Sequence, residues 1–294
     1  NTYTLANVYV GNVHFDASWF QGAMTAPDAV RWRVAWALSE LFVVSRVSAF
    51  DDNPYALSSY YDLLLDNCLG NYRTLLEKVT YHPAMGVYLT YMNNHATDST
   101  AKVYPDENYA RELMQLFSIG LYKLNLDGSE MRDANNQLIP TYNNNDIAGL
   151  AKVFTGLSWG DSRYLGDRDK SKWSYTLPMK FFPIDSSDAK KNPWKTKPRI
   201  VDGHEPGTKT FLGSTLPARP VLQGEQDIQD ALTILFNHQN VGPFIARRLI
   251  QRLVTSNPSP AYIQRIATVF NNNGSGVRGD LKAVVRAVLL DTEA

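Results

Sequence analysis

The run from Pro105 to Gly120 constrains the fold of this chain more than any other stretch of its 294 residues. Apolar side chains recur along the run at the spacing of one helix face: Tyr109, Leu113, Leu116 and Phe117. The acids that follow Pro105 favour the positive end of a helix dipole, and Gly120 supplies a C-terminal stop. The run therefore predicts a helix over residues 105–120 with one side in a core.

Four polar residues of this helix form two pairs with four-residue spacing, Glu107 with Arg111 and Asn108 with Glu112. Such pairs usually lie on a solvated face and contribute on the order of a few tenths of a kcal/mol. The alternative is a cleft that all four groups line. Glu112 lies close to the apolar edge, where a carboxylate is either a buried acid held by a partner or a functional acid.

The helix expected over residues 241–254 carries Arg247, Arg248 and Arg252. An arginine at an apolar edge requires a carboxylate partner. We therefore expect Arg247 or Arg248 to hold Glu112, whose charge would otherwise be costly to bury. Glu40, an isolated acid in the helix expected over 27–46, is likewise expected to pair with an arginine.

Helical periodicity covers most of the remaining chain and predicts a mainly α, compact multi-helix domain over residues 1–294, with about ten helices. Besides those already named, helices are expected over 54–68, 75–79, 83–91, 146–154 and 226–237, from Pro258 or Pro260 to about 271, and over 281–290. Turn signals at Asp127-Gly128 and Asn135-Asn136 lie between short alternating runs, which predicts one β-hairpin near residues 122–142.

Residues 157–224 differ from the rest, because seven of the fifteen prolines lie between Pro178 and Pro220. The weak periodicity predicts a long irregular excursion, rich in proline and aromatic residues, that packs on the helical domain over the amino-terminal end of helix 105–120. Aromatic side chains interleaved with lysine and arginine fit a surface for an anionic or sugar-like polymer, such as a polysaccharide. The alternative is a packed coil that its aromatic side chains fasten to the helices.

Composition and motifs exclude several function classes. Lys+Arg and Asp+Glu both number 29, so the basic excess of nucleic-acid-binding proteins is absent and we expect no nucleic-acid partner. The single Cys68 excludes an intrachain disulfide and a thiolate zinc site. The histidines never show ligand spacing, and no nucleotide-binding fingerprint occurs, so we expect neither metal nor cofactor. No run approaches the roughly 18 apolar residues of a membrane span.

Several segments together resemble one bacterial family. The most specific is Pro105–Phe117, and the others are Arg33–Ser45, Tyr60–Leu64, His82–Gly86, Gly149–Gly156, His204 with Lys209–Gly213, and Phe244–Leu249. They resemble the domain of unknown function 1800 family over nearly the whole chain. The resemblance implies an exported protein, periplasmic or secreted, whose partner belongs to a sulfatase-like, alkaline-phosphatase-type family encoded by neighbouring genes. It implies no established chemistry.

The two ends of the chain predict that it is a piece of a longer protein. It begins at Asn1 without a methionine, which fits a removed leader or a trimmed chain. It ends abruptly at Ala294.

Two function classes stay open. The favoured one is a non-catalytic binding or assembly protein of an envelope or extracellular complex, because no recognisable catalytic set occurs. The alternative is a hydrolase or lyase acting on an anionic or sugar polymer, with His204 of a Gly/Pro-rich loop within one water of Glu107 or Glu112. Its acid/base groups would be Glu107, Glu112 and His204, and its binding groups Asn108, Arg111, Arg247, Arg248 and Lys209. His204 is equally suited to anchor its own loop.

Overall fold

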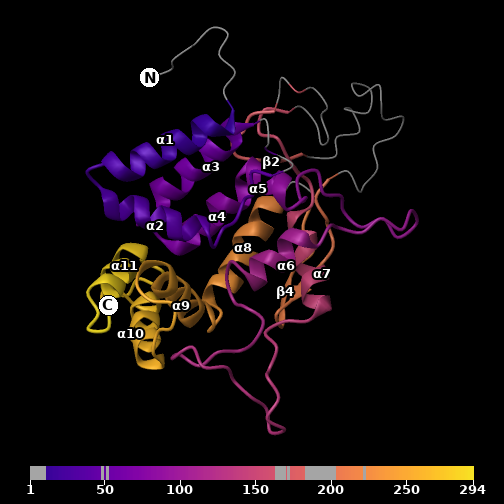
Figure 1. Ribbon diagram of the computed structural model, residues 1–294. Coiled ribbons are helices and arrows are strands. Elements are labelled where there is room, and N and C mark those ends of the chain that lie inside the picture. Colours follow the sequence, from indigo (N-terminus) through magenta and orange to yellow (C-terminus); the bar gives the residue numbers. More distant parts are fainter. Residues whose placement is uncertain are drawn as a thin grey trace.

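Helices dominate the computed structural model, which describes residues 11–47, 50, 53–162, 170, 173–182, 203–220 and 223–294 (Figure 1). Eleven α-helices and two small antiparallel sheets lie in this part of the chain. The mainly α prediction is therefore confirmed. Buried side chains from α1 to α11 join one hydrophobic cluster.

The amino-terminal helices are α1 (Asn12–Thr25), α2 (Ala29–Ser39) and α3 (Pro54–Asn67), which pack on one another (Figure 1). Trp19 of α1 joins them, because its ring contacts both Trp32 of α2 and Tyr61 of α3. The start of α3 follows from local sequence. The Asn53 side chain accepts a hydrogen bond from the backbone N–H of Ala56, and proline occupies the first helical position.

Two helices meet at His82, α4 (Tyr72–Tyr81) and α5 (Pro83–Tyr88). The buried His82 ring accepts a hydrogen bond from the backbone N–H of Ala84 through Nδ1, at 3.1 Å. His82 therefore caps the amino-terminal end of α5.

The central helix α6 (Asn108–Gln115) is shorter than the predicted span of residues 105–120. Its start is delayed because Asp106 accepts a hydrogen bond from the backbone N–H of Asn108 and is itself held by Asn94. After Gln115 the chain tightens into turns that end at Gly120. That glycine has a φ of 71°, and its Cα lies against Phe244, where a Cβ would come within 2.9 Å of the ring.

Two successive turns shape residues 121–142, which project from the helices (Figure 1). The prediction of one hairpin captured the antiparallel pairing, which consists of isolated bridges: Tyr122 with Pro140, Leu124 with Glu130, and Arg132 with Leu138. The side chains of Asp127 and Asp133 close the two turns by accepting backbone N–H groups, which divides the segment into two short ribbons.

Helix α7 (Asn144–Ala151) begins after Asn143, whose side chain accepts the backbone N–H groups of Asn145 and Asp146. It continues into the 3₁₀ turn η1 (Lys152–Phe154). Two small sheets follow. In the first, β1 (Leu157–Ser158) pairs with β2 (Lys180–Phe181), and in the second β3 (Lys209–Phe211) pairs with β4 (Ser214–Leu216). These strands belong to the predicted excursion over 157–224. Its stretches 163–169, 171–172, 183–202 and 221–222 lie outside the described residues.

Four carboxy-terminal helices complete the fold: α8 (Gly224–Asn237), α9 (Val241–Leu253), α10 (Pro260–Asn271) and α11 (Leu281–Leu289). Their predicted positions are confirmed to within a few residues. Helices α9, α10 and α11 gather below α2 (Figure 1), and α9 contacts both α2 and α11.

Tyrosines at the centre of the core bury their rings and satisfy their hydroxyl groups. Tyr109 of α6 stacks on Tyr91 with ring centroids 4.0 Å apart, and its hydroxyl lies 2.7 Å from Oγ1 of Thr80. The Tyr72 hydroxyl donates to the carbonyl of Phe117 at 2.6 Å. Burial raises the pKa of these phenols well above their ordinary range, so all remain neutral. In the described part of the chain, no helix combines the length and apolarity that a membrane span requires.

Candidate functional site

The polar residues of α6 divide into a surface pair and separate local contacts. Glu107 and Arg111 form the predicted ion pair, with Oε2 and Nη2 3.3 Å apart. Both side chains are about two-fifths exposed, at 41% and 42%, so the pair lies on a solvated face. Asn108 turns away from Glu112 and donates to Oγ1 of Thr90 at 2.8 Å.

The predicted pair between Glu112 and an arginine of α9 is wrong. Oε2 of Glu112 is buried without a hydrogen-bond partner, and burial raises the pKa of this carboxyl against the opposing charge of Arg111. Arg247 instead donates to the carbonyl of Gly128 at 2.5 Å. The Arg248 guanidinium lies over the Phe244 ring, 5.2 Å from its centroid. The turn around Gly128 carries a carbonyl to α9, and that carbonyl takes the place of the expected carboxylate.

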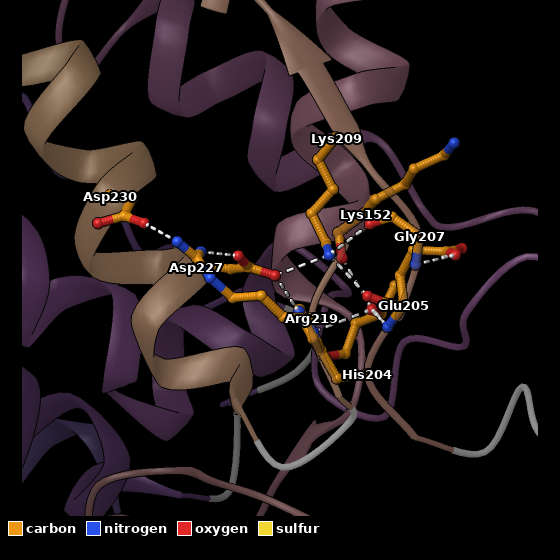
Figure 2. A network of polar contacts seen from close by, with 9 residues as sticks. Lys152, His204, Glu205, Gly207, Lys209, Arg219, Asp227 and Asp230 are labelled. Carbon is orange, nitrogen blue, oxygen red and sulfur yellow. Dashed lines mark hydrogen bonds and ion pairs between the residues drawn. The ribbon is translucent and has the colours of Figure 1, made fainter. Parts of the chain in front are cut away.

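His204 is fully buried. Figure 2 shows it among the polar side chains around Asp227. Its Nε2 donates to Oδ2 of Asp227 at 2.8 Å. Its Nδ1 lies 3.0 Å from the carbonyl oxygen of Thr155 and 3.4 Å from that residue's hydroxyl. Both ring nitrogens are therefore occupied by contacts with η1's end and with α8. No nitrogen is left for the expected water bridge to Glu107 or Glu112, and the loop-anchor alternative describes the observed contacts.

Lys209 of β3 is sealed in the same place. Its Nζ lies 2.7 Å from Oδ2 of Asp227, and it donates to the carbonyls of Glu205 at 2.6 Å and Gly207 at 3.0 Å. Three acceptors thus meet the three N–H groups of one ammonium, which is how a fully buried lysine is tolerated. All three N–H groups of the lysine predicted to bind a ligand are thus used by contacts within the chain.

Asp227 of α8 is the centre of this arrangement. Arg219 contacts its Oδ1 through Nη1 and reaches Oδ2 of Asp230 at 2.5 Å through Nη2 (Figure 2). Burial alone would raise the pKa of Asp227. Hydrogen bonds from His204 and Lys209 outweigh it, with Arg219 adding to them, and bring the pKa down to about 2.

We call these five residues the ionic clasp: His204, Lys209, Arg219, Asp227 and Asp230. The clasp fastens the chain around 204–219 to α8, while Thr155 and Glu205 tie the same loop to η1 and to the backbone of Thr97. His204, Lys209 and Asp227 are fully buried, so these three side chains face one another inside the protein and not the solvent. Sequence reasoning missed Asp227 and Arg219. An available signal was the acid on the apolar side of α8, directly before Ile228.

An open, concave face lies elsewhere, where α2, α9 and α11 meet. Two adjoining hollows of about 520 and 170 Å³ share Glu40 and Arg252 in their walls. We call this face the arginine groove. Its charged residues are Arg33, Glu40, Arg248 and Arg252, and its exposed apolar residues are Val30, Trp36, Val43, Leu116 and Leu289.

The charges of the arginine groove do not balance. Arg252 pairs with Glu40 at 3.0 Å, which confirms the predicted arginine partner of that acid. In the described part of the chain, no carboxylate lies within ion-pair distance of Arg33 or Arg248. Burial lowers the pKa of Arg248, and the neighbouring charges of Arg247 and Arg252 lower it further. Three guanidinium groups therefore face one carboxylate.

The residues predicted to form one site are distributed over three places. Asn108, Arg111 and Glu112 lie on α6, and Glu107 directly precedes it. His204 and Lys209 belong to the ionic clasp, and Arg247 and Arg248 lie on α9. Among the described residues, no three His, Cys, Asp or Glu side chains are grouped so that they could hold a metal ion.

Comparison with known proteins yields a family and no characterised relative. The model of the family described as protein of unknown function (DUF1800) matches residues 10–294. No curated protein and no solved structure matches the chain. Because the family match spans nearly the whole chain, this protein belongs to the DUF1800 family.

Proposed function

We propose that this chain is a non-catalytic binding or assembly protein, and that its arginine groove binds an acidic, amphipathic segment of a partner protein. One observation carries the proposal: the same concave face combines exposed apolar side chains with two arginines, Arg33 and Arg248, that have no carboxylate partner among the described residues. An apolar patch around a hollow is typical of an interaction site, and uncompensated positive charge selects a negative partner.

The composition of the groove fits a protein partner. Trp36 is 40% exposed although its ring is large and apolar. Tryptophan and arginine are the residue types that contribute most to protein–protein binding when they become buried. A segment with leucine-like side chains on one face and carboxylates on the other would cover Trp36 and meet Arg33 and Arg248 together.

The first partner to test is the sulfatase-like, alkaline-phosphatase-type protein that the family resemblance suggested. The same resemblance suggests that the complex forms in the periplasm or outside the cell. Both statements belong to the proposal, as does the role of the arginine groove in forming the complex.

The hydrolase or lyase alternative retains one supporting observation. Glu112 has a buried carboxylate oxygen without a partner and a raised pKa, the properties of a general acid. The other two proposed acid/base groups make contacts elsewhere, because His204 is buried in the ionic clasp and Glu107 pairs with Arg111 on the surface. The binding function is therefore the better supported of the two.

The test uses this protein and a purified sulfatase-like, alkaline-phosphatase-type protein encoded in the same genome, with affinity measured by calorimetry. Arg248→Glu and Trp36→Ala should each weaken the complex at least tenfold, since each removes one of the two features that the partner recognises. Lys102→Glu is the matched control, because it reverses an exposed positive charge outside the groove. Absence of a complex, or equal affinity for Arg248→Glu and Lys102→Glu, would overturn the proposal.

A further inference from the structure

A second hollow, of about 550 Å³, lies between α3, α4 and the segment 176–178. It is separate from the arginine groove and shares no residue with it. Its polar lining comes mainly from α3 and α4, with Asp62 and Asp66 on the first and Glu77, Lys78 and Tyr81 on the second. Its apolar lining is formed by Leu63, Leu177 and Pro178.

The wall formed by residues 176–178 is held in place at both ends. Before it, the Ser59 hydroxyl of α3 donates to the carbonyl of Tyr175 at 3.0 Å. After it, the backbone N–H of Met179 donates to the carbonyl of Tyr81 at 2.8 Å. The Met179 side chain fills the space beside Gly86, where a Cβ would come within 2.6 Å of its sulfur. The hollow is therefore built before any ligand arrives, which reduces the entropy cost of binding.

The negative charge of this hollow is uncompensated on the α3 side. Asp62 and Asp66 are four residues apart on one helix, so their carboxylates repel each other. Neither forms an ion pair within the described part of the chain, whereas Glu77 is engaged by Arg73 at 3.1 Å and by Gln229 at 2.8 Å. Both residues are exposed, so this repulsion is modest, and a cation bound between the two carboxylates would relieve it.

The other titratable residues that line the hollow do not neutralise the two aspartates. Burial lowers the pKa of His82 to about 4, so its ring is neutral at pH 7. Tyr81 stays protonated, because burial raises its pKa and Glu225 of α8 and Glu77 add to this effect. Lys78 also lines the hollow, but it is exposed on the α4 side, and within the described part of the chain it forms no ion pair with either aspartate.

We propose that this hollow binds an alkylammonium group, which is a primary ammonium on a hydrocarbon chain. The ammonium would lie between the carboxylates of Asp62 and Asp66, and the chain would lie along Leu63, Leu177 and Pro178. The apolar walls favour this ligand over a hydrated metal ion, because they cannot replace the water shell of such an ion. A lysine side chain of a peptide and a free polyamine share this chemistry. The inference goes beyond the proposed function, since it concerns a different face.

Titration calorimetry at pH 7 with hexylammonium and sodium as probes tests the ligand class. Spermidine and an acetylated, amidated lysine tripeptide then distinguish the two sources. Hexylammonium should bind with measurable heat and sodium should not. A preference for the tripeptide assigns the hollow to a protein chain, and a preference for spermidine assigns it to a free polyamine.

Two variants locate the site. Asp62→Asn with Asp66→Asn should weaken hexylammonium binding at least tenfold and should leave folding intact, because it removes a repulsion. Glu130→Gln neutralises an exposed acid outside the hollow and should bind like the unmodified protein, as should Trp36→Ala. Equal binding by the double variant and Glu130→Gln, or equal heats for hexylammonium and sodium, would overturn the proposal.

Discussion

Replacing Asp227 by asparagine is the sharpest test of the ionic clasp. The change keeps the shape of the side chain but removes the carboxylate that His204, Lys209 and Arg219 share. Lys209 then retains two carbonyl acceptors and no counter-charge, although it is fully buried. Removing one partner of a buried ion pair costs about 3 to 5 kcal/mol.

The pKa of Asp227 provides a second, independent magnitude. Lowering the pKa of a carboxyl group from its ordinary value of about 3.9 to about 2 corresponds to about 2.5 kcal/mol of stability at neutral pH. Asparagine loses this contribution and replaces one accepting oxygen by an NH₂ group, which faces donors and cannot accept from them. We therefore expect Asp227→Asn to lower the free energy of unfolding by about 3 to 5 kcal/mol at pH 7.

Urea unfolding followed by tryptophan fluorescence measures the loss, and Asp230→Asn is the matched control. Asp230 contacts the same Arg219, but its side chain is 32% exposed, so this variant should cost less than about 1 kcal/mol. The pKa of Asp227 is lowered in the fold, so its stabilisation is present above pH 4 and is lost as pH falls toward 2. Equal losses in the two variants, or an Asp227→Asn protein with the same acid dependence as the unmodified one, would refute the reasoning.

Three further predictions follow from other contacts. Gly149→Ala should lower the free energy of unfolding by about 1 to 3 kcal/mol, because the added Cβ would come within 1.8 Å of the Thr210 carbonyl oxygen. A melting temperature within 1 °C of that of the unmodified protein would contradict this. Glu112→Gln should leave the protein equally stable or raise its free energy of unfolding by up to about 1 kcal/mol at pH 7, because burial raises the pKa of this carboxyl and disfavours its charged form. A large loss of stability in urea unfolding would instead mean that the carboxylate has a partner. Arg111→Ala should cost less than about 1 kcal/mol, because the pair with Glu107 is solvated, and thermal unfolding in high salt should show no further loss.

The positions of most helices could be predicted because they depend on residues close together in sequence. Asn53 before Pro54, and Ser259 before Pro260, each place a capping oxygen within three residues of the N–H that it accepts. The pair of Glu107 with Arg111 is local in the same sense, since one helical turn brings the two side chains together. The length of α6 was overestimated because Asp106 and Asn94, from different segments, occupy the chain before Asn108.

The sequence by itself determined the mainly α fold, the local ion pair of α6 and the family, because periodicity, caps and motifs are properties of neighbouring residues. Only the tertiary structure decided which distant groups meet. Arg247 bonds a carbonyl 119 residues away, and His204 turns inward to Asp227, because the folding of separate segments sets these distances and no local pattern records them. The same holds for the arginine groove, which exists only where α2, α9 and α11 come together and leave their arginines without enough carboxylates.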